Sequence, residues 1–494
     1  MEDNKNLMVE KTKNTKLFAI IGLIAVALVA GFFIFKNLNK GGPLNKNEQI
    51  ISAIVDLGNQ YEESVDDFYQ PLGLKQISEK VKNGQLGLLA SAVINKEALN
   101  APEDLTINWS LAADVSKKHG YMSLEAKFKD QSFLSGSIIL NHDQLIADVP
   151  ALFDKALSIN LKTIGMDIHN SSFVNLSEDI EVESLKDLSI DLWKSPVTFN
   201  QYKEEILKLT ETETKAFKDK LNFVELEKHK VNVAEKEVAL DTYESVIPKD
   251  ELIALIDAYQ KAMLEVNNGK ITGIDLEKQI PNEEIKDWKE SFEKEWDRFE
   301  EPIKLIVGMD GNKVRYLEFK NKVDGNPVAL SVELLGEKIP FKDLFVKHGL
   351  VGEKDHGQYK LTTVKNGDVN TMIISGMLVE DTQLHEFGKI EFNTSTHDLT
   401  LEGQGVKLIA TIDNIVKGES FEFNLKDMIV DNQSVMNDLK SLQLKIDKPS
   451  LHELPTETLE VLKMSQEEAQ YFMMSVVMRL ISLGGQIGID IPIN

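Results

Sequence analysis

The chain of 494 residues contains no cysteine. Disulfide bonds, thiolate metal sites, iron–sulfur clusters and cysteine nucleophiles are therefore excluded together. An anchor attached through an acylated cysteine is excluded for the same reason. The absence fits a Gram-positive surface, where proteins often do without disulfides, and it fits a reducing compartment equally well.

The sequence also lacks the common catalytic and metal-binding motifs. It has no GxSxG elbow, no Walker lysine loop and no GxGxxG fingerprint after a strand. Two His-Glu pairs begin like the zinc motif HExxH, but Lys389 and Thr456 occupy the place of the second histidine. The Asp-Gly-Asn triplets at Asp310 and Asp324 lack the later oxygen ligands of a calcium loop, so we interpret them as hairpin turns. We expect no metal, no cofactor and no enzymatic activity.

Basic residues are outnumbered, with 55 lysines and arginines against 80 aspartates and glutamates, for a net charge of −25. A chain this acidic repels phosphate backbones, so we expect no nucleic-acid partner. The many carboxylates leave one alternative open. Two of them brought together by folding, as in glycoside hydrolases, would make the protein a hydrolase of cell-wall polymer, although the sequence favours no particular pair.

Long uncharged runs are rare, and the clearest is the 19-residue segment 17–35. As a helix, a run of this length approaches the ~30 Å hydrocarbon core of a bilayer and predicts a single transmembrane anchor. A cleaved signal peptide, cut near Ala25-Val26-Ala27, is the less favoured alternative because apolar chain continues past the cut. Four lysines precede the run and three follow it, which favours a cytoplasmic tail at 1–16 and an extracytoplasmic bulk after a tether at 36–46.

Apolar residues at helical spacing predict helices in three places. The first covers residues 47–69. Residues 196–301 are expected to be mostly helical. The last helix runs from Ser465 to Leu483, because Ser465 and Glu468 form a capping box at its start.

Aromatic residues form one stripe within the predicted helical region. Its members are Ile285, Trp288, Phe292, Trp296 and Phe299. Packing of this stripe on a sheet or on a partner helix is the favoured interpretation. If the rings were exposed, they would instead be the docking surface of an assembly protein.

Alternation with period two predicts strands in residues 86–149 and 303–447. Met122 and Leu124 lie on a dry face there, while Tyr121 and Glu125 lie on a wet one. This pattern is typical of antiparallel sheet with one solvated side. A short helix is predicted after Pro150, and Asn366-Gly367 is the clearest hairpin turn.

Together these patterns predict an α+β fold. An N-terminal transmembrane helix is followed by curved antiparallel sheet, with helices packed on one face and a helical insertion. The expected regions are 47–195, a first helix plus antiparallel sheet; 196–301, helical; and 302–494, a second antiparallel sheet region with a C-terminal helix.

The last helix is the most suggestive element for function. We expect an apolar ligand to contact Phe472, Met473, Val476 and Leu480, because methionine-rich faces accept varied apolar partners. An ordinary core helix is the alternative, and the more common fate of such a pattern.

The anchor, the antiparallel strands interrupted by helices, and the junction SGSIILNHDQLIADVPALFDKALSIN resemble membrane-anchored surface proteins of clostridia and related Firmicutes. Their architecture is similar to the half-barrel of the LolA/LppX lipoprotein-carrier type. The resemblance implies a curved sheet whose concave face is crossed by helices, with a lipid or acyl chain between the two. The chain departs from the carriers in having no lipidated cysteine and a longer helical block.

We therefore expect a nonenzymatic protein of the cell membrane, held by its N-terminal helix, whose extracytoplasmic part binds a lipid or another apolar ligand. The alternative is a structural or assembly protein that acts through envelope protein partners. The hydrolase is the third hypothesis.

Overall fold

The computed structural model describes residues 44–487, apart from residues 100, 102, 130, 173–181, 195–197, 269, 270, 273–289, 291, 292, 295, 324, 351–355 and 378–382. Within these residues, no helix has both the length and the apolar character needed to cross a membrane. This finding contradicts the prediction of a single-pass transmembrane fold. The segment on which that prediction rested, 17–35, lies outside the described residues.

One sheet of 21 strands forms most of the described chain. Its strands are β1 (Gln85–Ile94), β2 (Leu105–Asp114), β3 (His119–Phe128), β4 (Gln131–Asn141), β5 (Gln144–Asp148), β6 (Ala156–Asn160), β8 (Val224–Val233), β9 (Lys236–Val246), β11 (Lys304–Asp310), β12 (Lys313–Val323), β13 (Asn326–Leu334), β14 (Asp343–Leu350), β15 (His356–Asn366), β16 (Val369–Met377), β17 (His385–Asn393), β18 (Asp398–Gly403), β19 (Val406–Val416), β20 (Ser420–Val430), β21 (Gln433–Ser434), β22 (Leu439–Asp447) and β23 (Thr458–Glu460). The sheet is mixed, because β23 pairs in parallel with β6 while the other neighbours are antiparallel.

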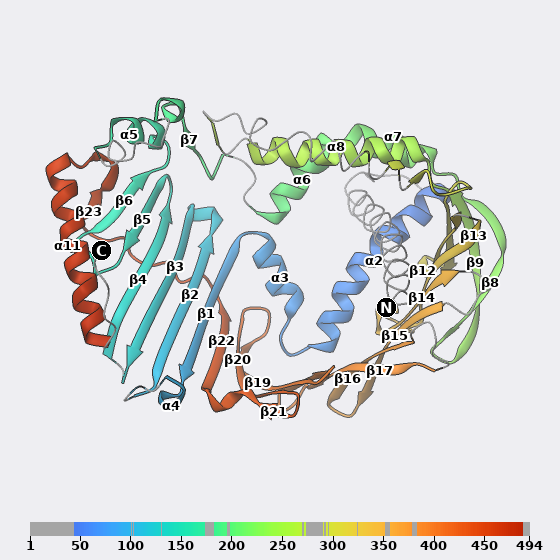
Figure 1. The fold of residues 1–494 in the computed structure, drawn as a ribbon. Helices are drawn as coiled ribbons and strands as arrows, with labels where there is room; N and C mark the ends of the chain where they lie inside the picture. Colours follow the sequence, from blue (N-terminus) through green and yellow to red (C-terminus); the bar gives the residue numbers. More distant parts are fainter. Residues whose placement is uncertain are drawn as a thin grey trace, which may run out of the picture.

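The strands follow one another across the sheet almost in chain order. Pairing runs from β8 through β9, β11 and onward to β20 and β22, and then continues from β22 to β1 and on to β6 and β23. The sheet curves so strongly that its two ends face each other (Figure 1). We call β1–β6 the open wing and β8, β9 and β11–β14 the packed wing.

Helices lie inside and across this curve. They are α2 (Lys46–Phe68), α3 (Leu74–Lys82), α4 (Lys96–Leu99), α5 (Ile164–Asn170), α6 (Phe199–Leu209), α7 (Glu211–Lys220), α8 (Lys249–Asn268) and α11 (Gln466–Ile487), beside a small sheet of β7 (Ser189–Ile190) and β10 (Ile271–Thr272). Helices α2 and α3 lie within the curve, α6, α7 and α8 extend across its open side, and α11 lies outside the open wing (Figure 1). Helix α2 begins at a capping box in which Asn45 and Glu48 bond each other's backbone amides.

The main hydrophobic core lies between the packed wing and the helices α2, α7 and α8. Leu305, Val307 and Leu334 of the sheet are fully buried there against Ile50 and Leu252 of the helices. A second cluster joins the end of α2 and the start of α3 to the middle of the sheet. The face of the sheet turned toward these helices is therefore its inner face.

The expected two sheet regions separated by a helical insertion are corrected to a single sheet. The region 196–301 contains the helices α6, α7 and α8, but also the hairpin β8–β9 at the end of the large sheet. The helix predicted after Pro150 is wrong as well, since β6 occupies that part of the chain. The hairpin turn at Asn366-Gly367 is confirmed, with Gly367 at φ +62° between β15 and β16.

Candidate functional site

The inner face of the open wing is apolar without interruption. The pairing register carries this face from Ile446 of β22 through Leu88 and Leu111 to Met122, Ile138 and the outer strands. Its central positions are Leu88, Ala90, Ala92, Ile107, Trp109, Leu111, Met122, Leu124, Ala126, Leu134, Gly136, Ile138, Leu140, Leu145, Ala147, Leu157 and Ile159. We call these positions the apolar face. None of them carries a polar side chain.

The apolar face is partly open to solvent. Leu124 remains 46% exposed, and Met122 and Ile138 are also among the exposed large hydrophobic residues. The opposite, polar face is covered more fully, since Asp114 and His119 are buried. Contiguous exposed apolar surface is uncommon in soluble proteins and marks interaction or ligand-binding surfaces.

The polar face is covered by the chain that follows β22. At Gly87, an added Cβ would meet the carbonyl oxygen of Lys448 at 2.5 Å, so the absence of a side chain there lets this segment cross the sheet closely. Further along, the ring of His452 lies 4.7 Å from that of Tyr121 on the same face. The crossing segment then reaches β23 beside β6. Because this segment lies outside the curve, the inner, apolar face is left without it.

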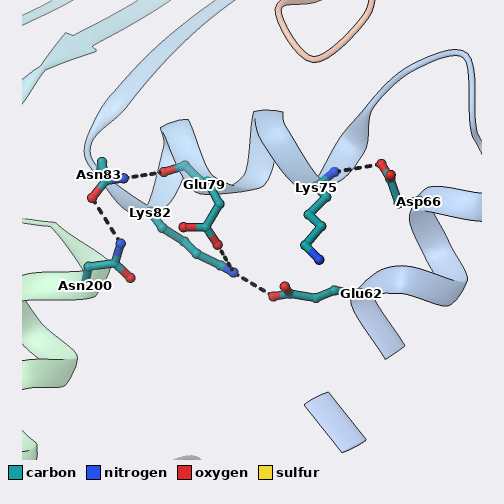
Figure 2. Close-up of polar contacts among 7 residues, drawn as sticks. All are labelled: Glu62, Asp66, Lys75, Glu79, Lys82, Asn83 and Asn200. Atoms are coloured by element: carbon teal, nitrogen blue, oxygen red, sulfur yellow. Dashed lines mark hydrogen bonds and ion pairs between the residues drawn. The ribbon is translucent and has the colours of Figure 1, made fainter. Parts of the chain in front are cut away.

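The hairpin formed by α2 and α3 stands beside the apolar face and is braced by charge. The Nζ atom of Lys82 lies 2.6 Å from Glu62 on α2 and 3.1 Å from Glu79 on α3 (Figure 2). Burial would lower the pKa of the Lys82 ammonium, but its hydrogen bonds to the two carboxylates raise it overall. At the facing ends of the two helices, the backbone amide of Lys75 in α3 donates to the carboxylate of Asp66 in α2 at 3.0 Å (Figure 2).

This hairpin is also joined to α6. The side-chain amide of Asn200 donates to the Asn83 Oδ1 atom at 3.0 Å (Figure 2). On the sheet side, the Nζ of Lys80 donates to the carbonyl oxygen of Gly418 at 2.8 Å. Helix α3 is therefore held both to α6 and to the turn between β19 and β20.

Helix α11 carries the four residues predicted to contact an apolar ligand. It begins after Ser465, whose hydroxyl and backbone amide bond Glu468 as predicted. The ring of Phe472 stacks on Phe153 at 5.5 Å between centroids, while Met473 and Leu480 are exposed and Val476 is half-buried. At 100° per residue, the four predicted residues fall within an arc of about 100° on α11, and this helix lies outside the curve of the sheet, away from its inner face (Figure 1).

The aromatic stripe is only partly described. Trp296 is buried, and its ring meets that of Phe299 edge to face at 6.2 Å in the main core. Ile285, Trp288 and Phe292 lie outside the described residues. The part of the stripe that the structure places therefore packs internally.

The titratable residues that the structure describes include one carboxyl group with a raised pKa, that of Asp343. No group of three or more histidine or acidic residues among them could hold a metal ion. Burial raises the pKa of Asp343, but the charges acting on this carboxyl are those of Lys360 and Lys342. A glycoside hydrolase also needs a second carboxyl group across the site from its acid.

A cleft of about 520 Å³ lies along the first turns of α2, away from the apolar face. Its lining mixes Ile51 and Ala53 with the charged side chains of Glu48, Asp56 and Lys218. Glu48 and Lys218 form an ion pair at 3.8 Å. Because the one cation of this lining that is named, Lys218, already pairs with Glu48, this cleft is a weaker ligand site than the apolar face.

The chain was compared with protein-family models, with curated proteins and with solved structures, and none of them matches. The assignment of the apolar face as a candidate site therefore rests on the geometry of this chain alone. The alternation of apolar and polar residues in β2 and β3 was visible in the sequence, where it predicted the dry face. The sequence carried no signal that this dry face would be left partly exposed in the described part of the chain.

Proposed function

We propose that the protein binds a lipid or another ligand with a large hydrocarbon part on the apolar face of the open wing. The observation that carries this proposal is the combination of uniform apolar chemistry with partial exposure. Leu124, Met122 and Ile138 keep their side chains accessible on adjacent strands. Covering such surface with hydrocarbon gains roughly 25 cal/mol for each Å² removed from water.

The chemistry of the face favours hydrocarbon over a polar ligand. A site for a sugar, a nucleotide or a peptide needs convergent hydrogen-bonding groups that fix orientation. The apolar face presents only aliphatic side chains and the indole of Trp109 across six strands. With neighbouring strands ~4.8 Å apart, the face is about 24 Å wide, which is broad enough for an extended chain.

The test uses the full chain and a fluorescent fatty acid as the probe. Leu124→Lys places a cation in the middle of the apolar face, and we expect probe affinity to fall at least about tenfold because the bound state would desolvate an unpaired charge. Leu89→Lys is the matched control. Leu89 is 43% exposed against 46% for Leu124, but it lies on the outer face.

The two variants distinguish probe binding on the apolar face from probe binding on other apolar parts of the chain. Equal loss of probe binding in Leu124→Lys and Leu89→Lys, or no loss in either, would contradict the assignment. Quenching of Trp109 by a brominated fatty acid gives a second readout. Fluorescence that is quenched as strongly in Trp109→Phe as in the unaltered chain would place the probe elsewhere.

A further inference from the structure

Helix α11 carries a broad exposed apolar arc. The side chains exposed on it are Tyr471, Met473, Met474, Val477, Met478 and Leu480. Tyr471, Met474 and Met478 are the most open of these, at 76%, 68% and 67%. At 100° per residue the six positions cover half the circumference of the helix over three turns. The other half, with Phe472 and Ala469, faces the rest of the protein.

We propose that this arc is the surface through which two copies of the chain associate. Three of the positions, Tyr471, Met474 and Met478, follow the spacing of a helix–helix seam, in which every third or fourth residue contacts the partner. A two-fold interface brings the same surface of each copy together, so a single apolar stripe is complementary to itself. This inference does not depend on the proposed ligand-binding function.

The charge of the helix favours a second copy over other occupants. From Gln470 to Gln486 the one charged residue is Arg479, whose guanidinium bonds Asp154 at 2.5 Å. A basic partner or an anionic lipid surface would be recognised by complementary charge, which this stretch does not offer. Two copies of a chain with net charge −25 repel each other, and they meet most easily where each is neutral.

Position and size agree with this partner. Helix α11 lies on the outer side of the open wing, at the rim of the molecule, where a second molecule can approach (Figure 1). Packing the arc against its copy would bury on the order of 600 Å² per chain, below the ~800 Å² of a standard interface. We therefore expect a weak dimer that dissociates at roughly micromolar concentration.

Sedimentation velocity of the full chain tests the proposal. The unaltered chain should shift from monomer to dimer as concentration rises, and the double variant Met474→Glu, Met478→Glu should weaken the dimer at least about tenfold through buried like charges. Val364→Glu is the control, because Val364 is a similarly exposed apolar residue on the outer face of β15. It should dimerise like the unaltered chain.

The absence of cysteine permits a second, direct test. Met474→Cys creates a unique thiol that should form a disulfide-linked dimer on mild oxidation, whereas Val364→Cys should not. A monomer at every concentration would overturn the proposal. Dimers that persist unchanged in the glutamate variant would overturn it too. Binding of monomers to neutral lipid vesicles, lost in that variant, would assign the arc to a lipid surface instead.

Discussion

The two wings of the sheet present the same chemistry on their inner faces and bury it differently. In the packed wing, Leu305 and Val307 are fully buried under α2, α7 and α8. In the open wing, Leu124 occupies an equivalent inner position and is nearly half exposed. Apolar and polar residues alternate along the strands of both wings. The difference in burial therefore comes from which helices pack on each inner face.

The connectivity explains the difference. Helices α7 and α8 flank the hairpin β8–β9 and so lie next to the packed wing in the chain, whereas α2, which precedes β1 of the open wing by way of α3, packs in the core of the packed wing. The strands β1–β5 are joined by short connections without a helix long enough to cover a sheet. The inner face of the open wing is therefore exposed because its own connections are short and because α2 packs on the other wing, which supports its use as a binding surface.

The largest expected effect is a difference between the wings in how much a leucine-to-alanine substitution lowers the free energy of unfolding. Leu305→Ala should lower the free energy of unfolding by about 3 kcal/mol, because it leaves a cavity in the main core. Leu124→Ala should cost less than about 1 kcal/mol, since its side chain gives up little buried contact. Urea unfolding followed by circular dichroism measures both. Equal losses would mean that Leu124 is covered in solution and that the open wing is not open.

The sequence predicts local features of the fold because these features have local causes. The start of α2, the capping box at Ser465 and the turn at Gly367 each depend on a few neighbouring residues. The face on which Met122 and Leu124 lie follows from the period of two alone.

The hairpin β8–β9 was missed for a physical reason. Its turn is Ala234-Glu235, and both residues have positive φ, at +46° and +66°. Such a turn is normally recognised by Asn or Gly, so no turn signal was present. The strand β8 is also highly charged, as suits a strand at the edge of a sheet, and it therefore resembles the surface of a helix.

Nonlocal features could not be read at all. The pairing of β1 with β22 joins residues 87 and 447 and turns two predicted sheets into one. The sequence of neither strand identifies the strand with which it pairs, because register is specified by burial and not by sequence complementarity. The same limit hid the candidate site, whose exposure depends on helices that pack elsewhere.

A smaller effect concerns the hairpin of α2 and α3, which lies within the curve of the sheet (Figure 1). Lys82→Met keeps the aliphatic stem and removes the charge that joins α3 to α2, so we expect a loss of about 1 kcal/mol in unfolding free energy. Hydrogen exchange should accelerate in α3 and stay unchanged in β11. A double-mutant cycle with Glu62→Gln isolates the pair.

Lys75→Met provides the matched control on the same helix. Its Nζ lies 3.9 Å from Glu63, and both side chains are exposed. Exposed pairs contribute little, so this variant should stay within about 0.3 kcal/mol of the unaltered chain. If Lys75→Met and Lys82→Met cost the same, the hairpin is not braced by the pair that Figure 2 shows.

The smallest effect concerns the buried polar face of the open wing and depends on pH. Burial lowers the pKa of His119, although a side-chain hydrogen bond with Asn141 and the charge of Asp114 act in the opposite direction. Its Nε2 atom is buried with no hydrogen-bond partner in the described chain, so protonation would bury an unsatisfied donor.

The sign follows from linkage. Below the ordinary histidine value of 6.5, the unfolded chain binds a proton that the folded chain resists, so His119 lowers stability as the pH falls through this range. His119→Asn removes the titrating imidazole. The free energy of unfolding of the variant, relative to that of the unaltered chain, should therefore increase as the pH falls from 7.5 to 5. Urea unfolding at each pH measures this difference. A difference that stays constant over this range would show that the imidazole is hydrated, and that the polar face of the open wing is as accessible as its apolar face.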